Sequence, residues 1–77
     1  MELNMISEIG KIVMIDSIEY KITYIDEKKK RITVEPIEEK NHLNLNQAII
    51  IENHPYIVTY INEGKKRISL QLVNKGV

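Results

Sequence analysis

The chain of 77 residues contains no cysteine, phenylalanine or tryptophan, and alanine occurs once. The absence of cysteine excludes disulfide bonds and thiolate metal sites. Two histidines, His42 and His54, are too few for a structural zinc site without carboxylate ligands. Small domains usually need a disulfide, a metal or a second subunit, because they bury only ~60% of their unfolded surface. This chain can therefore be stabilised by dense apolar packing or by self-association.

The chain also has no excess of positive or negative charge, because eleven basic residues balance eleven acidic ones. A protein whose main task is to bind phosphate usually carries a basic excess. The zero net charge therefore weakens the case for a nucleic-acid-binding function, although basic and acidic residues can still be segregated on the surface. The chain has no apolar run near the ~20 residues that cross a bilayer, and its N-terminus does not read as a secretion signal. We expect a soluble cytoplasmic protein that does not bind membranes.

Residues branched at Cβ dominate what is present, with 15 isoleucines and 5 valines. Such side chains pack well on a pleated sheet and lose rotamer freedom in a helix. Apolar residues occupy the even positions of 18–24 and 32–34, with the charged stretch 26–31 between them. This period of two predicts a β-hairpin with one buried face. The residues on that face are Tyr20, Ile22, Tyr24, Ile32 and Val34.

The hairpin sequence is repeated, as TYIDEKKKRITVEPI from Thr23 and TYINEGKKRISLQLV from Thr59. Nine of eighteen positions are identical when Tyr20 is set against Tyr56 without gaps. Internal repeats usually mean that one unit cannot bury its apolar face alone. The second copy predicts a buried face made of Tyr56, Val58, Tyr60, Ile68, Leu70 and Leu72.

Each copy also has an earlier strand, at 11–15 and at 48–51, and the consecutive isoleucines of the latter predict burial on both faces. Pro36 should end its strand or lie at an edge, since it lacks an amide donor. Gly64 is expected to adopt a left-handed backbone at its turn. Lys28 holds the matching place in the first copy, so the two turns could differ in type. Residues 1–10 fit either a helical turn or a strand.

These patterns predict an all-β fold, a small barrel or sandwich built from two three-stranded antiparallel meanders with pseudo-two-fold symmetry. We expect a single domain over 1–77, with repeat 1 at about 9–37, a connector at 38–46 and repeat 2 at about 47–73. The stretch IGKIVMIDSIEYKITYIDEKKKRITVEPI, from Ile9 to Ile37, resembles the small SH3-like barrels in general. The resemblance is one of architecture and carries over no functional residues.

The candidate partner-binding residues are the basic groups at the two hairpin tips, which could contact a phosphate backbone or an acidic protein. They are Lys28, Lys29, Lys30, Arg31, Lys65, Lys66 and Arg67. The competing interpretation is that a hairpin tip must be solvated, and that lysines near strand edges discourage aggregation. The four tyrosines share a face with aliphatic residues, so we expect them in the core rather than stacking on bases.

The opposite, odd-numbered face carries too many apolar groups for a surface that is fully exposed to water. Either the sheet folds so that both of its faces are covered, or part of this face forms a partner or subunit interface. Its apolar members are Val13, Ile15, Ile25, Ile37, Ile57, Ile61 and Val73. The sequence contains no nucleophile motif, paired carboxylates, Gly-rich phosphate loop or metal-ligand spacing. We therefore predict no catalytic residues, no metal and no cofactor.

The leading hypothesis is a non-enzymatic module that docks onto a protein partner through the odd-numbered face and the hairpin tips. The Ile-, Lys- and Asn-rich composition suits an AT-rich bacterial or bacteriophage genome, for which a regulator or inhibitor of a host protein is a natural role. One alternative is a nucleic-acid-binding protein that uses the two basic tips. Another is a structural homo-oligomer subunit.

Overall fold

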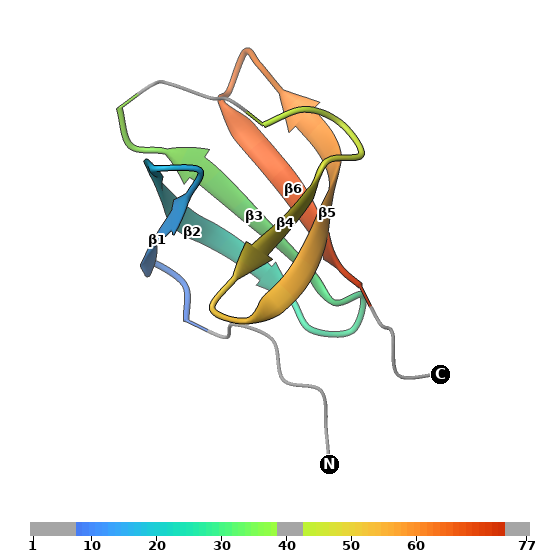
Figure 1. Cartoon of the computed structure of the whole chain (residues 1–77). Coiled ribbons are helices and arrows are strands. Elements are labelled where there is room, and N and C mark those ends of the chain that lie inside the picture. Colours follow the sequence, from blue (N-terminus) through green and yellow to red (C-terminus); the bar gives the residue numbers. More distant parts are fainter. Residues whose placement is uncertain (1–7, 39–42, 74–77) are drawn as a thin grey trace.

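Six β-strands account for the regular structure of the computed structural model, which describes residues 8–38 and 43–73 (Figure 1). The strands are β1 (Ile12–Ile15), β2 (Ile18–Asp26), β3 (Arg31–Pro36), β4 (Ala48–Ile51), β5 (His54–Asn62) and β6 (Arg67–Leu72). Residues 8–10 are not in a strand. The remainder of the prediction for residues 1–10 lies outside the described residues, as do positions 39–42 of the expected connector.

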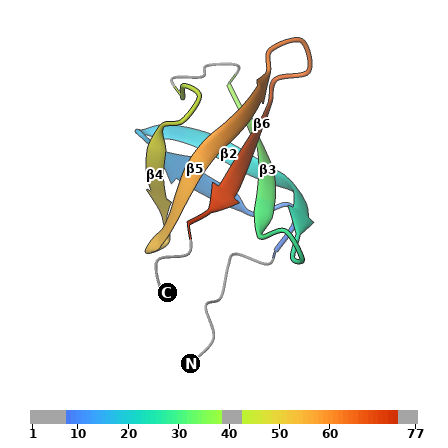
Figure 2. The same ribbon diagram turned by 90° about the vertical axis from the view of Figure 1, so that its right-hand side faces the viewer.

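Antiparallel pairing joins the strands in the order β1-β2-β3-β6-β5-β4. The pairing of β3 with β6 links the two hairpins, and a short strand lies on the outer side of each hairpin. Because the end strands β1 and β4 are also in contact, the sheet curls into a nearly closed barrel (Figures 1 and 2). The predicted all-β, antiparallel, barrel-like fold is confirmed. The β3–β6 pair and the β1–β4 contact lie on opposite sides of this barrel.

The interior is filled from alternate positions of all six strands, because successive side chains of a strand point to opposite faces. Among the described residues, no buried side chain is charged. Burial of this apolar surface, at about 25 cal/mol per Å², is the main stabilising contribution in a chain without disulfides. The core consists of Val13, Ile15, Tyr20, Ile22, Ile32, Val34, Leu43, Ile49, Ile51, Tyr56, Val58, Ile68, Leu70 and Leu72.

Two tyrosines predicted to be in the core are outside it. Tyr24 is 58% exposed and Tyr60 is 56% exposed. The register of β2 against β3 shifts between Ile22 and Tyr24, and that of β5 against β6 shifts between Val58 and Tyr60. Each shift is a β-bulge, which adds one unpaired residue and turns the following side chains to the other face. The prediction of strict alternation through the whole strand is therefore wrong beyond each bulge.

The extra residue in each bulge is a threonine, and its hydroxyl compensates for the disrupted ladder. Thr23 Oγ1 donates a hydrogen bond of 3.3 Å to the carbonyl of Thr33. Thr59 Oγ1 donates one of 3.2 Å to the carbonyl of Ser69. A carbonyl beside a bulge would otherwise lose part of its hydrogen bonding.

The strand β4 is not buried on both faces as its three isoleucines predicted. Ile49 and Ile51 are buried, but Ile50 between them is 70% exposed. The reason is topological, because the barrel covers only the inner face of each strand. Ile50 is therefore an apolar side chain on the outer surface, and it contributes to the site described below.

The two hairpin turns, residues 27–30 and 63–66, have the same conformation rather than different ones. The left-handed residue in each is a lysine, Lys30 or Lys66, with φ of 57° in both cases. Gly64 has no positive φ, so the prediction for it is wrong. The side chain that precedes each turn, Asp26 or Asn62, accepts a hydrogen bond from the backbone N–H three residues later, at 3.2 and 3.1 Å. Such local bonds from the backbone to an Asp or Asn side chain set the loop geometry without glycine.

Several backbone bonds outside the regular ladder recur at positions 36 residues apart. The carbonyl of Ile22 accepts from Gly10 N–H at 2.7 Å, and that of Val58 accepts from Asn46 N–H at 2.8 Å. Leu72 N–H donates to the Lys30 carbonyl at 2.8 Å, whereas the residue 36 positions before Leu72 is a proline, which has no N–H. As predicted, Pro36 ends its strand. The residues with positive φ also fall into pairs, which are Gly10 and Asn46, Asp16 and Glu52, Ser17 and Asn53, and Lys30 and Lys66.

The face assignment can be tested with two isoleucines of opposite exposure. We expect Ile22→Ala to lower the free energy of unfolding by about 2–5 kcal/mol, because it removes methyl groups from a fully buried side chain. The same substitution at the exposed Ile50 should change it by no more than about 0.5 kcal/mol. Urea denaturation followed by circular dichroism measures both. Equal losses at the two positions would contradict the assignment.

Candidate functional site

The basic residues predicted to bind a partner form two separate groups. Because β3 and β6 are antiparallel, the two turns lie at opposite ends of this pair, on one side of the barrel (Figure 2). All seven residues are exposed, but the structure does not bring them into a single cluster. The first group is Lys28, Lys29, Lys30 and Arg31, and the second is Lys65, Lys66 and Arg67.

The two arginines contact the neighbouring strand on the outer face of the sheet. Arg31 Nε donates to Gln71 Oε1 at 2.7 Å, and Arg67 Nε donates to Glu35 Oε2 at 3.1 Å. The carboxylate therefore offsets part of the positive charge of Arg67, whereas Arg31 faces a neutral amide. Exposed pairs of this kind contribute at most about 1 kcal/mol to stability, so their main effect is to orient the guanidinium groups.

Four residues lie side by side across the outer face, one on each of four adjacent strands. Tyr24 of β2 is paired with Thr33 of β3, which is paired with Ser69 of β6, which is paired with Tyr60 of β5. Neighbouring strands are about 4.8 Å apart, so the Cα atoms of the two tyrosines are separated by roughly 14 Å. The row therefore has an aromatic side chain at each end and two hydroxyl groups between them.

This row forms a surface groove of about 430 Å³, which we call the tyrosine groove. Its floor contains the hydroxyl-bearing residues of β3 and β6, and cationic side chains of the β5–β6 hairpin line one end. Such a lining can stack on planar rings, donate hydrogen bonds and attract anions. The lining residues are Thr23, Tyr24, Thr33, Tyr60, Asn62, Lys65, Arg67 and Ser69.

On the opposite side of the barrel, side chains bridge both ends of the seam between β1 and β4. Lys11 Nζ is 2.7 Å from Glu52 Oε2, and Gln47 Nε2 donates to Asp16 Oδ2 at 3.2 Å. The hydrogen bond to Glu52 raises the pKa of the Lys11 ammonium above its ordinary value. No backbone ladder joins β1 and β4 here. Because both bridges are exposed, each contributes at most about 1 kcal/mol to the closure of the seam.

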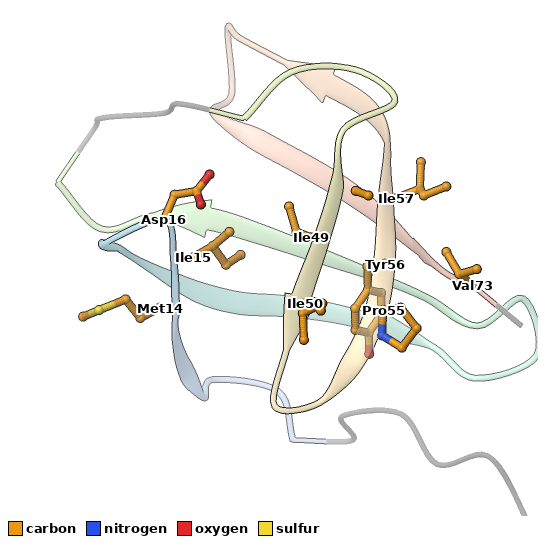
Figure 3. Close-up of a pocket in the computed structure, with 10 residues that line it drawn as sticks. Met14, Ile15, Asp16, Ile49, Ile50, Pro55, Tyr56, Ile57 and Val73 are labelled. Carbon is orange, nitrogen blue, oxygen red and sulfur yellow. The ribbon is translucent and has the colours of Figure 1, made fainter. Parts of the chain in front are cut away.

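A hollow of about 530 Å³ opens at this seam (Figure 3). The side chains of Ile15 and Ile49 lie between the two strands, while Met14 points outward from β1. Most of the lining is aliphatic, and the carboxylate of Asp16 lies at one end. The hollow can therefore accept an apolar group, but it offers little with which to orient a polar substrate.

Five of the residues that line the hollow form an apolar surface on β4, β5 and the residue after β6. Cross-strand pairs place Ile50 opposite Pro55 and Ala48 opposite Ile57. Val73 joins them because its N–H donates to the Pro55 carbonyl at 2.9 Å. We call these five residues the β4–β5 patch. Ile50 and Ala48 are exposed, and the other three are half-buried.

The predicted odd-numbered apolar face is wrong as a single surface. Val13 and Ile15 are buried, because β1 has the parity that points odd positions inward. Ile25 and Ile61 pack against the core, since they follow the bulges. The three remaining members, Ile37, Ile57 and Val73, are at the outer surface, and two of these belong to the β4–β5 patch.

Within residues 8–38 and 43–73, no group of three or more His, Cys, Asp or Glu side chains could hold a metal ion. In the same part of the chain, no helix is long and apolar enough to cross a membrane. His42 lies outside the described residues.

Comparison of the chain with protein-family models, curated proteins and solved structures found no match.

Sequence reasoning missed both the tyrosine groove and the β4–β5 patch. A signal for the groove was present, because Tyr-Ile follows Thr in each copy and two adjacent large apolar residues interrupt strict alternation. A signal for the patch lay in the differences between the copies. Pro55 and Ile57 stand where the first copy has Glu19 and Lys21.

The exposure of the tyrosines can be measured directly. We expect acrylamide to quench the fluorescence of Tyr24 and Tyr60 efficiently, because both are more than half exposed, and that of Tyr20 and Tyr56 poorly, because both are buried. Replacing Tyr24 and Tyr60 with phenylalanine should remove the readily quenched fraction. If the double variant keeps it, the bulges do not turn these side chains outward.

Proposed function

We propose that the chain is a non-enzymatic binding module that docks onto a protein partner through the β4–β5 patch and the adjoining seam hollow. The observation that supports this most directly is the high exposure of Ile50 within an apolar surface that contains no charged side chain. Contiguous exposed apolar surface on a small domain usually marks an interaction site. The docking surface is thus relocated from the odd-numbered face to the second half of the barrel.

The first half of the chain supplies a comparison for this surface. At the positions 36 residues earlier, β1 and β2 pair Ile12 with Lys21 and Met14 with Glu19. Covering a lysine or a glutamate with an apolar partner costs desolvation energy, whereas covering proline and isoleucine does not. The corresponding surface of the second half can therefore be buried at lower cost.

The seam hollow suits an anchor residue of the partner. Binding energy at protein interfaces is concentrated in a few large side chains that enter well-packed pockets. The hollow has mostly aliphatic walls, and Ile50 is one of its lining residues. We infer that a leucine-, methionine- or aromatic-containing segment of the partner inserts there while its flanks cover the patch.

We also propose that the barrel consists of two related meanders about a pseudo-two-fold axis, and that it is of the SH3-like kind. The recurrence of the same backbone bonds and positive-φ positions 36 residues apart supports the first part. The SH3-like assignment depends on the small size and the order of antiparallel strands. In a bacterium or bacteriophage, inhibition or regulation of a host protein would be the corresponding biological role.

A transplant variant can test the docking surface. The double substitution Pro55→Glu with Ile57→Lys gives the patch the residues that the first copy carries at Glu19 and Lys21, so the sheet should tolerate it. We expect peptides selected from a random displayed library on the wild-type chain to contain apolar anchors. They should bind the double variant at least about tenfold more weakly, because ~1.4 kcal/mol of lost contact already gives that factor.

Lys28→Ala serves as the control, because it changes charge on the other side of the barrel. It should leave the affinity of the selected peptides unchanged. Circular dichroism confirms that each variant is folded. If the peptides bind the transplant variant as tightly as they bind the wild type, the β4–β5 patch is not the docking surface. A wild-type dimer that the transplant dissolves, seen by sedimentation, would assign the patch to self-association instead.

A further inference from the structure

A second surface, unrelated to the proposed protein docking, lies on the opposite side of the barrel. The β4–β5 patch adjoins the seam between β1 and β4, whereas the tyrosine groove is centred on the β3–β6 pair. The groove differs from the patch in chemistry as well as position, because hydroxyls, aromatic rings and cationic groups line it. A ligand of this groove would therefore leave the patch uncovered.

The zero net charge of the chain conceals an uneven distribution. The two long hairpins, residues 21–35 and 57–71, hold eight basic side chains and four acidic ones. In the rest of the described residues, Lys11 is the single lysine or arginine, and it is outnumbered by Glu8, Asp16, Glu19, Glu38 and Glu52. Of this basic excess, Lys65 and Arg67 line the groove, and Arg31 lies two residues from Thr33 on β3. Glu35 offsets part of the charge of Arg67. A basic surface of this kind attracts polyanions despite an overall neutral charge.

The exposed tyrosines point to a ligand with accessible planar rings. A large aromatic side chain that is more than half exposed gains little from burial in the protein, and both bulges direct such a side chain to the same groove. In double-stranded nucleic acid the bases are stacked on one another, so their faces cannot reach a tyrosine. Single-stranded nucleic acid leaves the faces of its bases accessible for stacking on aromatic side chains.

The remaining groups of the groove match a sugar–phosphate backbone. Thr33 and Ser69 place hydroxyl groups between the two rings, and hydroxyls are common donors to phosphate oxygens. Lys65 lines one end of the groove. Arg67 donates to Glu35 through Nε, and the terminal nitrogens of a guanidinium provide further donors.

We propose that the tyrosine groove binds single-stranded nucleic acid, with a base stacked on each of Tyr24 and Tyr60 and the intervening backbone over Thr33 and Ser69. Lys65 and Arg67 neutralise phosphates at one end, and Lys29 and Arg31 do so towards the other hairpin tip. Stacking and phosphate contacts are insensitive to base identity, so the binding has little sequence preference. An adaptor with a nucleic-acid surface on one side and a protein surface on the other would result.

Fluorescence anisotropy with a labelled oligothymidylate of about 16 nucleotides tests this, because single-strand sites in small barrels span roughly 4–16 nucleotides. We expect the wild type to bind the single strand more tightly than a duplex of equal length. Each of Tyr24→Ala and Tyr60→Ala should weaken binding about tenfold, while Tyr24→Phe and Tyr60→Phe should retain it, since phenylalanine keeps the ring. Lys65→Ala should lower the dependence of log K on log salt by about one unit.

Lys11→Gln is the matched control, since it removes a basic residue outside the groove and introduces the residue found at Gln47. It should bind the oligonucleotide like the wild type. The Pro55→Glu, Ile57→Lys variant should also bind it normally, so failure of the peptide-docking proposal and failure of this one are separable. No binding at low salt, equal affinity for duplex and single strand, or unchanged affinity of the Tyr24→Ala, Tyr60→Ala double variant would overturn the proposal.

Discussion

The pairing of β3 with β6 is the interaction on which the rest of the structure depends. It is the only strand pairing between the two hairpins in the described sheet, and the inward-facing residues on both sides of it are essentially fully buried. These residues are Ile32, Val34, Ile68 and Leu70. Without this pairing, each hairpin and its short outer strand would expose one apolar face to water. A chain with no cysteine therefore obtains its core by joining two incomplete sheets rather than by cross-linking one.

Closing the barrel also decides what appears on its outside. A strongly curved sheet needs local bends, and the bulges at Thr23 and Thr59 provide them at matching places in the two long strands. The same bulges move Tyr24 and Tyr60 from the inner face to the outer one, while the residues after them return aliphatic groups to the edge of the core. One geometric device thus serves both closure and the formation of an aromatic surface. The threonine hydroxyls reduce its cost by donating to carbonyls of the neighbouring strand.

Most of the strands could be predicted from the sequence because alternation is a direct consequence of strand geometry. Ile22, Val34, Val58 and Leu70 have the burial that their parity predicted. The odd or even position of a residue no longer predicts its burial after the extra residue of a bulge, as at Tyr24. It also does not predict burial where the sequence cannot show whether one or both faces of the sheet are covered, as at Ile50. The basic tips were easy to locate as solvent-exposed segments, but their separation to opposite ends of the β3–β6 pair depends on long-range register. A single sequence contains no local signal for the pairing of residues about 40 positions apart.

The differences between the two halves are more informative about binding than their similarities. Matching positions that face the core keep aliphatic or aromatic side chains, because both halves must fill the same interior. On the outer face the halves keep the matching pairs Tyr24 and Tyr60, and Arg31 and Arg67. They diverge elsewhere, with Glu35 against Gln71 beside the arginines and with Glu19 and Lys21 against Pro55 and Ile57. Folding alone places no such demand on an exposed position, since either type of residue is tolerated there at a cost of a few tenths of a kcal/mol. The fold therefore does not require the absence of charge at these two outward positions of one half, and this absence is the feature on which the proposed docking surface rests.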